Sequence, residues 1–207
     1  MSKQHTVFVI DDDPSVRKAV ARLLRSAGHQ AETFVSAEEF LSRPHYDGLG
    51  CLILDVKMPG QSGLDLQEVL AKEGYHLPII FVSGRSDISI SVKAMKGGAV
   101  DFLTKPFNNT VLLEAVRLSL ARNRQDRASR AEVQEIHQRL QTLTMREHEV
   151  LSLVVSGRLN KQIAYELNIS EKTVKVHRAR VMEKMRVDSV ADLVRLAEKV
   201  GISAAPR

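Results

Sequence analysis

Polar side chains follow four separate apolar runs of the chain. Carboxylates follow two of the runs, a hydroxyl ends the third and an ammonium lies just past the fourth: Asp11 and Asp12 after Val7–Ile10, Asp55 after residues 51–54, Ser83 after Ile79–Val82, and Lys105 after Asp101–Leu103. If these runs are neighbouring parallel strands, their carboxyl ends share one crevice, where open α/β sheets bind ligands. This combination of groups suits Mg²⁺ together with a phosphoryl group.

Clustered carboxylates can act in two ways. Their oxygens are the ligands that Mg²⁺ prefers, and a carboxylate can attack phosphorus to form an aspartyl phosphate. A cation must be present, because the negative charges repel an incoming phosphoryl group. Lys105 can pair with phosphoryl oxygens, Ser83 can donate a hydrogen bond to one, and Gly84 leaves room beside it. Taken alone, acidic residues after a strand also cap helices, and we expect Asp13 to cap the helix that Pro14 begins.

Strand-like and helix-like stretches alternate over the first 120 residues. The expected strands are Val7–Ile10, residues 30–34, Cys51–Asp55, Ile79–Val82 and Asp101–Leu103. The expected helices are Pro14–Ser26, Ala37–Ser42, Leu64–Lys72, Ile88–Lys96 and Thr110–Ala121. This order predicts a parallel sheet covered by helices on both faces, which would place the four polar groups at one edge.

Composition limits the class of protein. Apolar residues make up 43% of 207 residues, enough for one or two domains, and Cys51 is the only cysteine, which argues against a disulfide framework. The first residues show no signal-peptide pattern and no apolar run approaches the roughly 20 residues of a membrane span, so we expect a cytoplasmic protein without a membrane partner. The net charge is +5, and residues 144–207 carry 12 Lys and Arg against 8 Asp and Glu. A nucleic-acid partner is therefore expected at that end.

The last third of the chain predicts four helices. Thr144 and Glu147 form a capping box before the first, and the others span residues 160–167, Glu171–Met185 and Val190–Val200. The short turn before Ser170 indicates a helix-turn-helix, whose second helix lies in the DNA major groove. We expect that helix to bury Val174, Val181 and Met185 and to present an outward face of Lys172, Thr173, Lys175, Val176, His177, Arg178, Ala179 and Arg180.

Residues 121–143 lack Gly and Pro, so the preceding helix can continue through them as a helical connector. Apolar positions and one serine recur there at intervals of four and three residues: Ser129, Val133, Ile136, Leu140 and Leu143. Two structures fit this spacing, an amphipathic helix packed on a neighbouring domain and a short dimeric coiled coil. We divide the chain into domains at 1–121 and 143–207, with a linker at 122–142.

The motifs of residues 5–121 resemble the receiver domain of two-component response regulators. They are Ile10-Asp11-Asp12, Leu54-Asp55-Val56-Lys57-Met58-Pro59 with Gly63, Val82-Ser83-Gly84 and Lys105-Pro106-Phe107. The resemblance implies a flavodoxin-like sheet in the order 2-1-3-4-5 and phosphoryl transfer from a histidine kinase to Asp55. It further implies that Mg²⁺ is held by Asp11, Asp12, Asp55 and the Lys57 carbonyl, and that Lys105 contacts the phosphoryl group. Ser83 and Phe102 are then the switch residues, and the Lys105–Pro106 peptide bond is expected to be cis. We expect Lys57 and Arg85 to tune phosphate loss.

Residues 143–201 resemble the LuxR-type DNA-binding domain. The matching motifs are Leu143–Glu147, Asn160–Ala164 and Ile169–His177, and together with the receiver they make the chain similar to NarL/FixJ response regulators, most of all the FixJ type. The resemblance implies base contacts from Lys175, Val176 and Ala179. It implies DNA-backbone contacts from Lys161, Lys172, Thr173, His177 and Arg180.

These observations predict a transcription regulator that dimerises and binds double-stranded DNA when Asp55 is phosphorylated. We expect it to catalyse only its own phosphorylation and dephosphorylation. The alternative is an aspartyl-phosphate phosphatase of the haloacid-dehalogenase type, since Asp11 and Asp13 form an Asp-x-Asp. That alternative needs a further acidic motif after Lys105, where residues 107–125 offer only Glu114, and it leaves Asp55 unexplained. A receiver that only stores phosphate would leave the basic helix-turn-helix unexplained.

Overall fold

The computed structural model describes residues 5–84 and 88–202. The chain divides into two compact units, Met1–Arg127 and Ala128–Arg207. Each unit is described by itself below.

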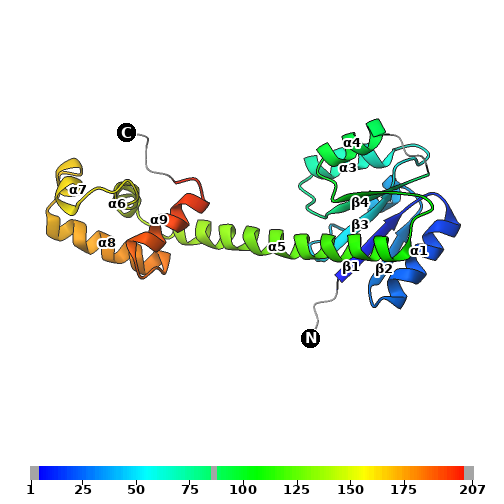
Figure 1. Ribbon diagram of the computed structural model, residues 1–207. Helices are drawn as coiled ribbons and strands as arrows, with labels where there is room; N and C mark the ends of the chain where they lie inside the picture. The colour runs from blue at the N-terminus through cyan, green and yellow to red at the C-terminus, as the bar shows by residue number, and fades with distance from the viewer. Residues whose placement is uncertain (1–4, 85–87, 203–207) are drawn as a thin grey trace. The chain divides into compact units, whose positions relative to one another are not determined.

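The first unit is built on a five-stranded parallel sheet (Figure 1). Its strands are β1 (His5–Ile10), β2 (Gln30–Phe34), β3 (Leu49–Asp55), β4 (Ile79–Ser83) and β5 (Asp101–Thr104). They lie in the order β2-β1-β3-β4-β5, which confirms the predicted flavodoxin-like topology. The register pairs Ile10 with Leu54, Asp55 with Val82 and Ser83 with Thr104. The carboxyl ends of the three inner strands therefore align at one edge.

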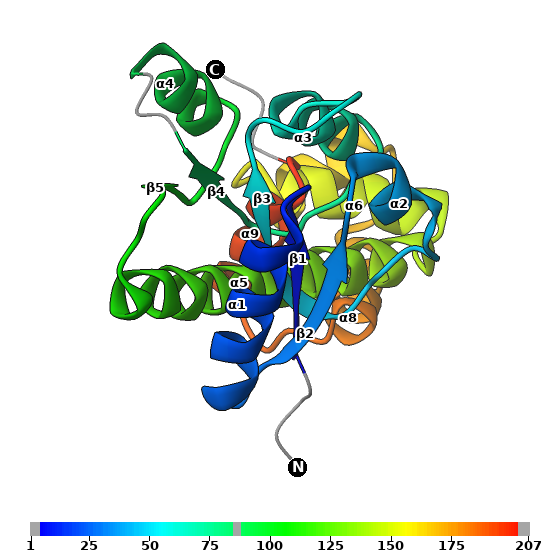
Figure 2. The same cartoon turned by 90° about the vertical axis from the view of Figure 1, so that its right-hand side faces the viewer.

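Helices cover both faces of this sheet, as predicted from the strands' near-continuous apolar character. One face packs against α1 (Pro14–Ser26) and the first half of α5 (Asn109–Gln141), through Val20, Leu24, Leu112 and Val116. The other face packs against α2 (Ala37–Ser42), α3 (Gly63–Lys72) and α4 (Ile88–Lys96), and Phe40, Leu66 and Ala94 are among its buried residues. Figure 2 shows α1 and α3 on opposite sides of the sheet.

Local signals in the sequence fix where the helices begin. Asp13 caps α1 by accepting a hydrogen bond from the Ser15 backbone N–H at 2.7 Å, and Pro14 occupies the first helical position, where its missing N–H costs nothing. Ser62 and Asp65 form a capping box at the start of α3. Gly28 ends α1 with a φ of 84°, a conformation that other residues rarely adopt.

The long helix α5 connects the two units. α5 runs unbroken for 33 residues through the linker that we placed at 122–142, as the lack of Gly and Pro there allowed, and the two units divide within it, between Arg127 and Ala128. The part before this point is fixed to the first unit, because the buried Asn123 side chain accepts from the Gly50 N–H and donates to the His76 carbonyl. Arg127 donates to Asp47 and to the Gly48 carbonyl.

The rest of α5 belongs to the second unit. Ile136, Leu140 and Leu143 are buried there among α6 (Met145–Val155), α7 (Asn160–Glu166), α8 (Glu171–Met185) and α9 (Val190–Lys199). These three positions therefore pack on the neighbouring helices, as the first of the two predicted structures requires, while Ser129 is exposed and Val133 is half-buried. Arg139 strengthens this packing by donating to the Met185 carbonyl at 3.0 Å.

The four predicted helices of the second unit are all present, and α8 has the predicted bounds. Val174, Val181 and Met185 are buried in its core, as expected from their spacing. Over residues 5–84 and 88–202, no helix is long and apolar enough to cross a membrane.

Candidate functional site

Three of the predicted site residues meet at the carboxyl edge of the sheet. The Lys105 ammonium donates to Asp11 Oδ2 at 2.6 Å and to Asp55 Oδ1 at 2.5 Å. Asp11 follows β1, Asp55 ends β3 and Lys105 follows β5, so the parallel topology brings together residues up to 94 positions apart. Both carboxylates are nearly buried, with Asp11 1% and Asp55 5% exposed.

Asp55 is held in place by its own loop as well as by Lys105. Its second oxygen, Oδ2, accepts from the Lys57 backbone N–H at 2.5 Å. Gly63, at the start of α3, approaches so closely that a Cβ there would lie 2.2 Å from the Asp55 carbonyl oxygen. This explains why the motif around Asp55 includes a glycine.

The environment of Asp55 disfavours its charge. Burial raises the pKa of the Asp55 carboxyl above its usual range, and the charge of Asp11 adds to this, although the bonds from Lys105 and Lys57 oppose it. Burial alone would lower the pKa of the Lys105 ammonium, but its bonds to Asp11 and Asp55 raise it overall. The surroundings therefore favour the charged form of Lys105, whereas they make ionisation of Asp55 less favourable than that of a free carboxyl.

The predicted metal ligands are only partly gathered. Asp11 and Asp55 direct oxygens at one cation, the Lys105 ammonium, whereas Asp12 is exposed and Asp13 serves as the helix cap. In the part of the chain that the structure describes, no three carboxylate, imidazole or thiolate side chains are grouped so that they could hold a metal ion. These oxygen donors nevertheless fit Mg²⁺. Two buried carboxylates already share one cation, the Lys105 ammonium. Asp12 is next to Asp11 in the chain and exposed, so an ion bound there could keep several of its waters.

The switch and phosphate residues also lie at this edge. Ser83 ends β4 and is buried, and a Cβ at Gly84 would meet no atom within 4 Å, so there is space beside the hydroxyl. Phe102 is half-buried on β5, with its ring centroid 6.4 Å from that of Phe81. The Lys105–Pro106 peptide bond is cis, as expected. Arg85 lies outside the described residues.

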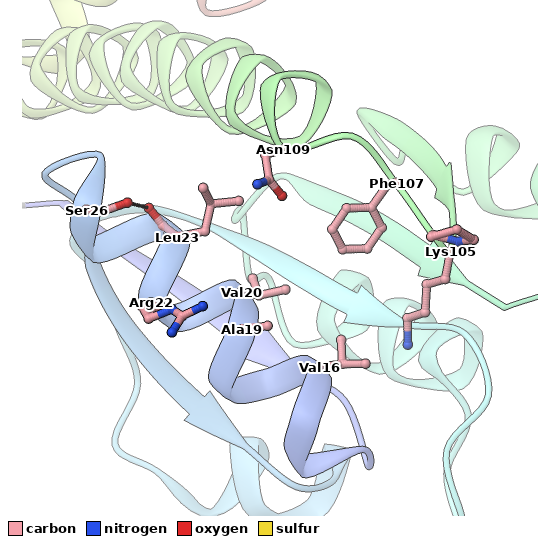
Figure 3. Close-up of a pocket in the computed structure, with 10 residues that line it drawn as sticks. Val16, Ala19, Val20, Arg22, Leu23, Ser26, Lys105, Phe107 and Asn109 are labelled. Atoms are coloured by element: carbon pink, nitrogen blue, oxygen red, sulfur yellow. Dashed lines mark hydrogen bonds between the residues drawn. The ribbon is translucent and has the colours of Figure 1, made fainter.

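A groove beside Lys105 was not foreseen from the sequence. It has a volume of about 760 Å³ and is mostly apolar; it is lined by Val16, Ala19, Val20 and Leu23 of α1 and by Lys105, Pro106 and Phe107, with Arg22, Ser26 and Asn109 completing it. Figure 3 shows the α1 side chains facing Phe107 across it. The sequence of α1 could have indicated the groove. Val16, Ala19 and Leu23 are apolar but are not fully buried against the sheet, so the apolar face of α1 is wider than the part that the sheet covers.

The second candidate site is the exposed face of α8. Lys172, Lys175, Val176, Ala179 and Arg180 are exposed as predicted, and so is Lys161 on α7. Thr173 is half-buried, and its hydroxyl shares a 2.8 Å hydrogen bond with that of Ser170. This face is basic and apolar in alternation, a composition suited to phosphates and thymine methyl groups.

Two residues of α8 face inward more than we predicted. Arg178 is half-buried and donates to Asn160 Oδ1 at 2.5 Å, so it ties α8 to the start of α7 instead of lying on the open face. His177 is also half-buried, and its Nδ1 is a buried atom without a hydrogen-bond partner. Spacing alone could not show this, because both positions lie at the boundary between the buried and open sides of the helix.

Comparisons with known proteins agree with this geometry. The model of the response regulator receiver domain matches residues 7–117, and that of the bacterial regulatory proteins of the luxR family matches residues 141–197. Nodulation protein W of Bradyrhizobium diazoefficiens is 47% identical over 98% of this chain and 89% of its own length. The transcriptional regulatory protein FixJ of Rhizobium meliloti is 42% identical over 93% of this chain and 95% of its own length.

Solved structures give the same result. The response regulator StyR is 47% identical with a TM-score of 0.84, over 95% of this chain and 99% of that one. Full-length FixJ from B. japonicum is 38% identical with a TM-score of 0.59, over 98% of this chain and 99% of that one. The chain therefore belongs to the two-component response regulators that join a receiver domain to a LuxR-type DNA-binding domain.

Proposed function

We propose that Asp55 accepts a phosphoryl group from a partner histidine kinase, with Mg²⁺, and that this modification controls dimerisation and DNA binding. One observation carries the proposal. The Asp55 carboxylate is nearly buried at the sheet edge, beside a second carboxylate, and it is hydrogen-bonded to Lys105. Its burial raises its pKa, so its charged form is unfavourable there. A charged group kept in such surroundings is typical of a reactive site.

The transfer would proceed on Asp55. A carboxylate oxygen of Asp55 attacks phosphorus, a P–O bond forms, the P–N bond of the phosphohistidine breaks, and its electron pair returns to the imidazole nitrogen of the kinase. Lys105, which now pairs with both carboxylates, would pair with a phosphoryl oxygen instead. Mg²⁺ held by Asp11, Asp12, Asp55 and the Lys57 carbonyl supplies the charge neutralisation that lets a phosphoryl group approach this acidic edge.

The acyl phosphate would then act through Ser83 and Phe102. Its oxygens accept hydrogen bonds, so the Ser83 hydroxyl moves toward the phosphoryl group and the half-buried Phe102 ring turns into the space left behind. Moving a two-state equilibrium from 1:99 to 99:1 needs about 5.5 kcal/mol of differential stabilisation. A few new contacts supply only part of this, so dimerisation would complete the shift.

The groove next to Lys105 would receive the kinase. Its walls are apolar residues of α1 and Phe107, and Lys105 reaches from it to Asp55. A partner helix packed there would place its phosphohistidine within reach of the acceptor. Leu23→Glu should therefore slow transfer from the kinase, while phosphorylation by acetyl phosphate, which needs no docking, stays unchanged.

In the second unit, α8 would enter the major groove. The exposed side chains of Lys175, Val176 and Ala179 would reach base edges. DNA-backbone contacts would come from Lys161, Lys172, Thr173, His177 and Arg180. The protein would act as an enzyme only in its own phosphorylation and dephosphorylation. The phosphatase alternative finds no support, because Asp13, the second residue of the Asp-x-Asp, is the cap of α1.

The proposal is tested by DNA binding. Duplexes bound by the acetyl-phosphate-treated chain would be selected from a random pool, and their affinity measured by fluorescence anisotropy. We expect treatment to strengthen binding by wild type and to have no effect on Asp55→Asn. Lys175→Ala should weaken specific binding by about 1–3 kcal/mol, with Lys199→Ala, a change on α9, as the control. Equal affinity of treated wild type and Asp55→Asn would contradict control by Asp55.

A further inference from the structure

Two histidines face each other at the edge of the sheet opposite the carboxylates. His5 is the first residue of β1 and His29 immediately precedes β2. Their ring nitrogens, His5 Nε2 and His29 Nδ1, are 2.6 Å apart, and the ring centroids are 4.8 Å apart with the planes at 66°. Because both lie where their strands begin, they are remote from the Asp55 pocket, which lies where the strands end.

The backbone holds both residues in place. His5 pairs with Leu49 of β3 in the parallel ladder. The His29 N–H donates to the Leu24 carbonyl at 2.9 Å, directly after Gly28, whose φ of 84° turns the chain out of α1. The two imidazoles are therefore carried by the first residue of β1 and by the hydrogen-bonded turn that leads from α1 into β2.

We propose that His5 and His29 form a bidentate site for a transition-metal ion of the Zn²⁺, Ni²⁺ or Cu²⁺ class. Imidazole nitrogen is a preferred ligand of these ions, and it binds them at about 2.0–2.1 Å. On a tetrahedral ion, two such nitrogens lie about 3.3 Å apart. The two rings would therefore have to separate by about 0.7 Å and rotate so that both lone pairs point at the ion, because the two nitrogens now face each other across a hydrogen bond.

The protonation state of the pair favours a metal. Only a neutral imidazole offers a lone pair to an ion, and burial, followed by the neighbouring His5, lowers the pKa of His29 below its usual value. The lowered pKa favours the neutral ring of His29. The proton now shared between the two facing nitrogens would move to the other nitrogen of its ring when an ion binds.

The affinity of such a site is limited by its ligand number. Among the described residues, no third His, Cys, Asp or Glu joins these two in a metal-holding group, so water would fill the remaining positions. We expect binding in the micromolar range. The bound ion would join β2, an edge strand of the sheet, to β1 and so stabilise the first unit against unfolding.

A zinc titration of the full chain tests this proposal independently of phosphorylation. Isothermal titration calorimetry with ZnCl₂ would be run in excess Mg²⁺, which occupies the carboxylate pocket, on wild type, His5→Asn, His29→Asn and the control His76→Asn. His76 is an exposed histidine outside the pair. Two variants are used because either alone could disturb the strand, and metal-free unfolding midpoints check that both remain folded.

We expect wild type and His76→Asn to bind one ion and both pair variants to bind about 100-fold more weakly, because the second imidazole of a chelate binds intramolecularly. Zinc should also raise the unfolding midpoint of wild type but not of His5→Asn. Absence of zinc uptake by wild type, or equal affinity in the folded pair variants, would overturn the site and leave a plain hydrogen bond between two rings.

Discussion

Each unit of this protein buries a carboxylate against a lysine, and the two carboxylates have opposite properties. Asp55 lies 2.5 Å from Lys105, and Glu147, which is 1% exposed, lies 2.6 Å from Lys184. The pKa of Asp55 is raised, chiefly by burial, whereas that of Glu147 is lowered, chiefly by its hydrogen bond from Lys184. Two similar ion pairs thus have different effects: the charged form of Asp55 is unfavourable, whereas that of Glu147 is stabilised.

The difference comes from the remaining neighbours. Glu147 also accepts from the Thr144 backbone N–H at 2.8 Å, within a capping box at the start of α6. Asp55 instead shares its lysine with a second buried carboxylate, Asp11, whose charge adds to the penalty. The surroundings of Glu147 therefore stabilise its charge, while those of Asp55 disfavour its charge, as the proposed phosphoryl acceptor requires.

The largest expected effect is that of Lys105→Met. This change leaves Asp11 and Asp55 buried without their shared cation, and breaking a buried pair in this way typically costs about 3–5 kcal/mol. Chemical denaturation at neutral pH would measure the loss. The control is Lys93→Met, whose exposed pair with Glu68 should contribute less than about 1 kcal/mol.

Magnesium sharpens this prediction. Because Mg²⁺ can replace the missing ammonium, it should raise the unfolding midpoint of Lys105→Met more than that of wild type. Equal response of the two proteins would contradict the assignment of Asp11 and Asp55 as metal ligands.

A smaller loss is expected for Glu147→Gln. Hydrogen bonds to a charged group contribute about 1.5–3 kcal/mol each, and the neutral amide weakens those from Lys184 and Thr144. Since the pKa of Glu147 is lowered by folding, the loss should be complete above the unfolded-state pKa and should disappear as the pH falls through the folded-state value. Denaturation at several pH values checks this, with Glu149→Gln, an exposed partner of Arg146, as the matched control.

The smallest effect, and one of opposite sign, is predicted for Asp55→Asn. Folding raises the pKa of Asp55, so its contribution to stability is fully present below the unfolded-state pKa and is lost as the pH rises through the folded-state value. The neutral amide avoids that loss, and the variant should be more stable than wild type at neutral pH by on the order of 1 kcal/mol. Chemical denaturation at several pH values would measure the difference, and an Asp55→Asn variant less stable than wild type at neutral pH would break the contrast with Glu147.

The sequence predicted the pocket better than it predicted the connections. Asp11, Asp55 and Lys105 could be placed together because parallel strands end at one edge, and no side-chain detail was needed. The capping box of Thr144 and Glu147 was also predicted, since it is local. The pairing of Glu147 with Lys184, 37 residues away, was not, because it depends on how α6 packs against α8.

The position at which α5 passes from one unit to the other depends on similar contacts. Residues 121–128 are polar and free of glycine, so the sequence shows that a helix can continue but not what holds it. Asn123 bonds to Gly50 of β3 and Arg127 to Asp47 in the loop before it, which assigns that stretch to the first unit, while Ile136 and Leu140 fill the core of the second. Side chains such as Arg178, at the edge of a buried face, were likewise beyond what helical spacing can resolve.

The most direct test of this contrast is intact-mass spectrometry after incubation with Mg²⁺ and acetyl phosphate, followed by peptide mapping. Wild type, Glu147→Gln and Asp55→Asn would be measured side by side. We predict a single added phosphoryl group, mapped to Asp55, on wild type and Glu147→Gln, and none on Asp55→Asn. A phosphoryl group retained by Asp55→Asn, or mapped to Asp11, would contradict the account.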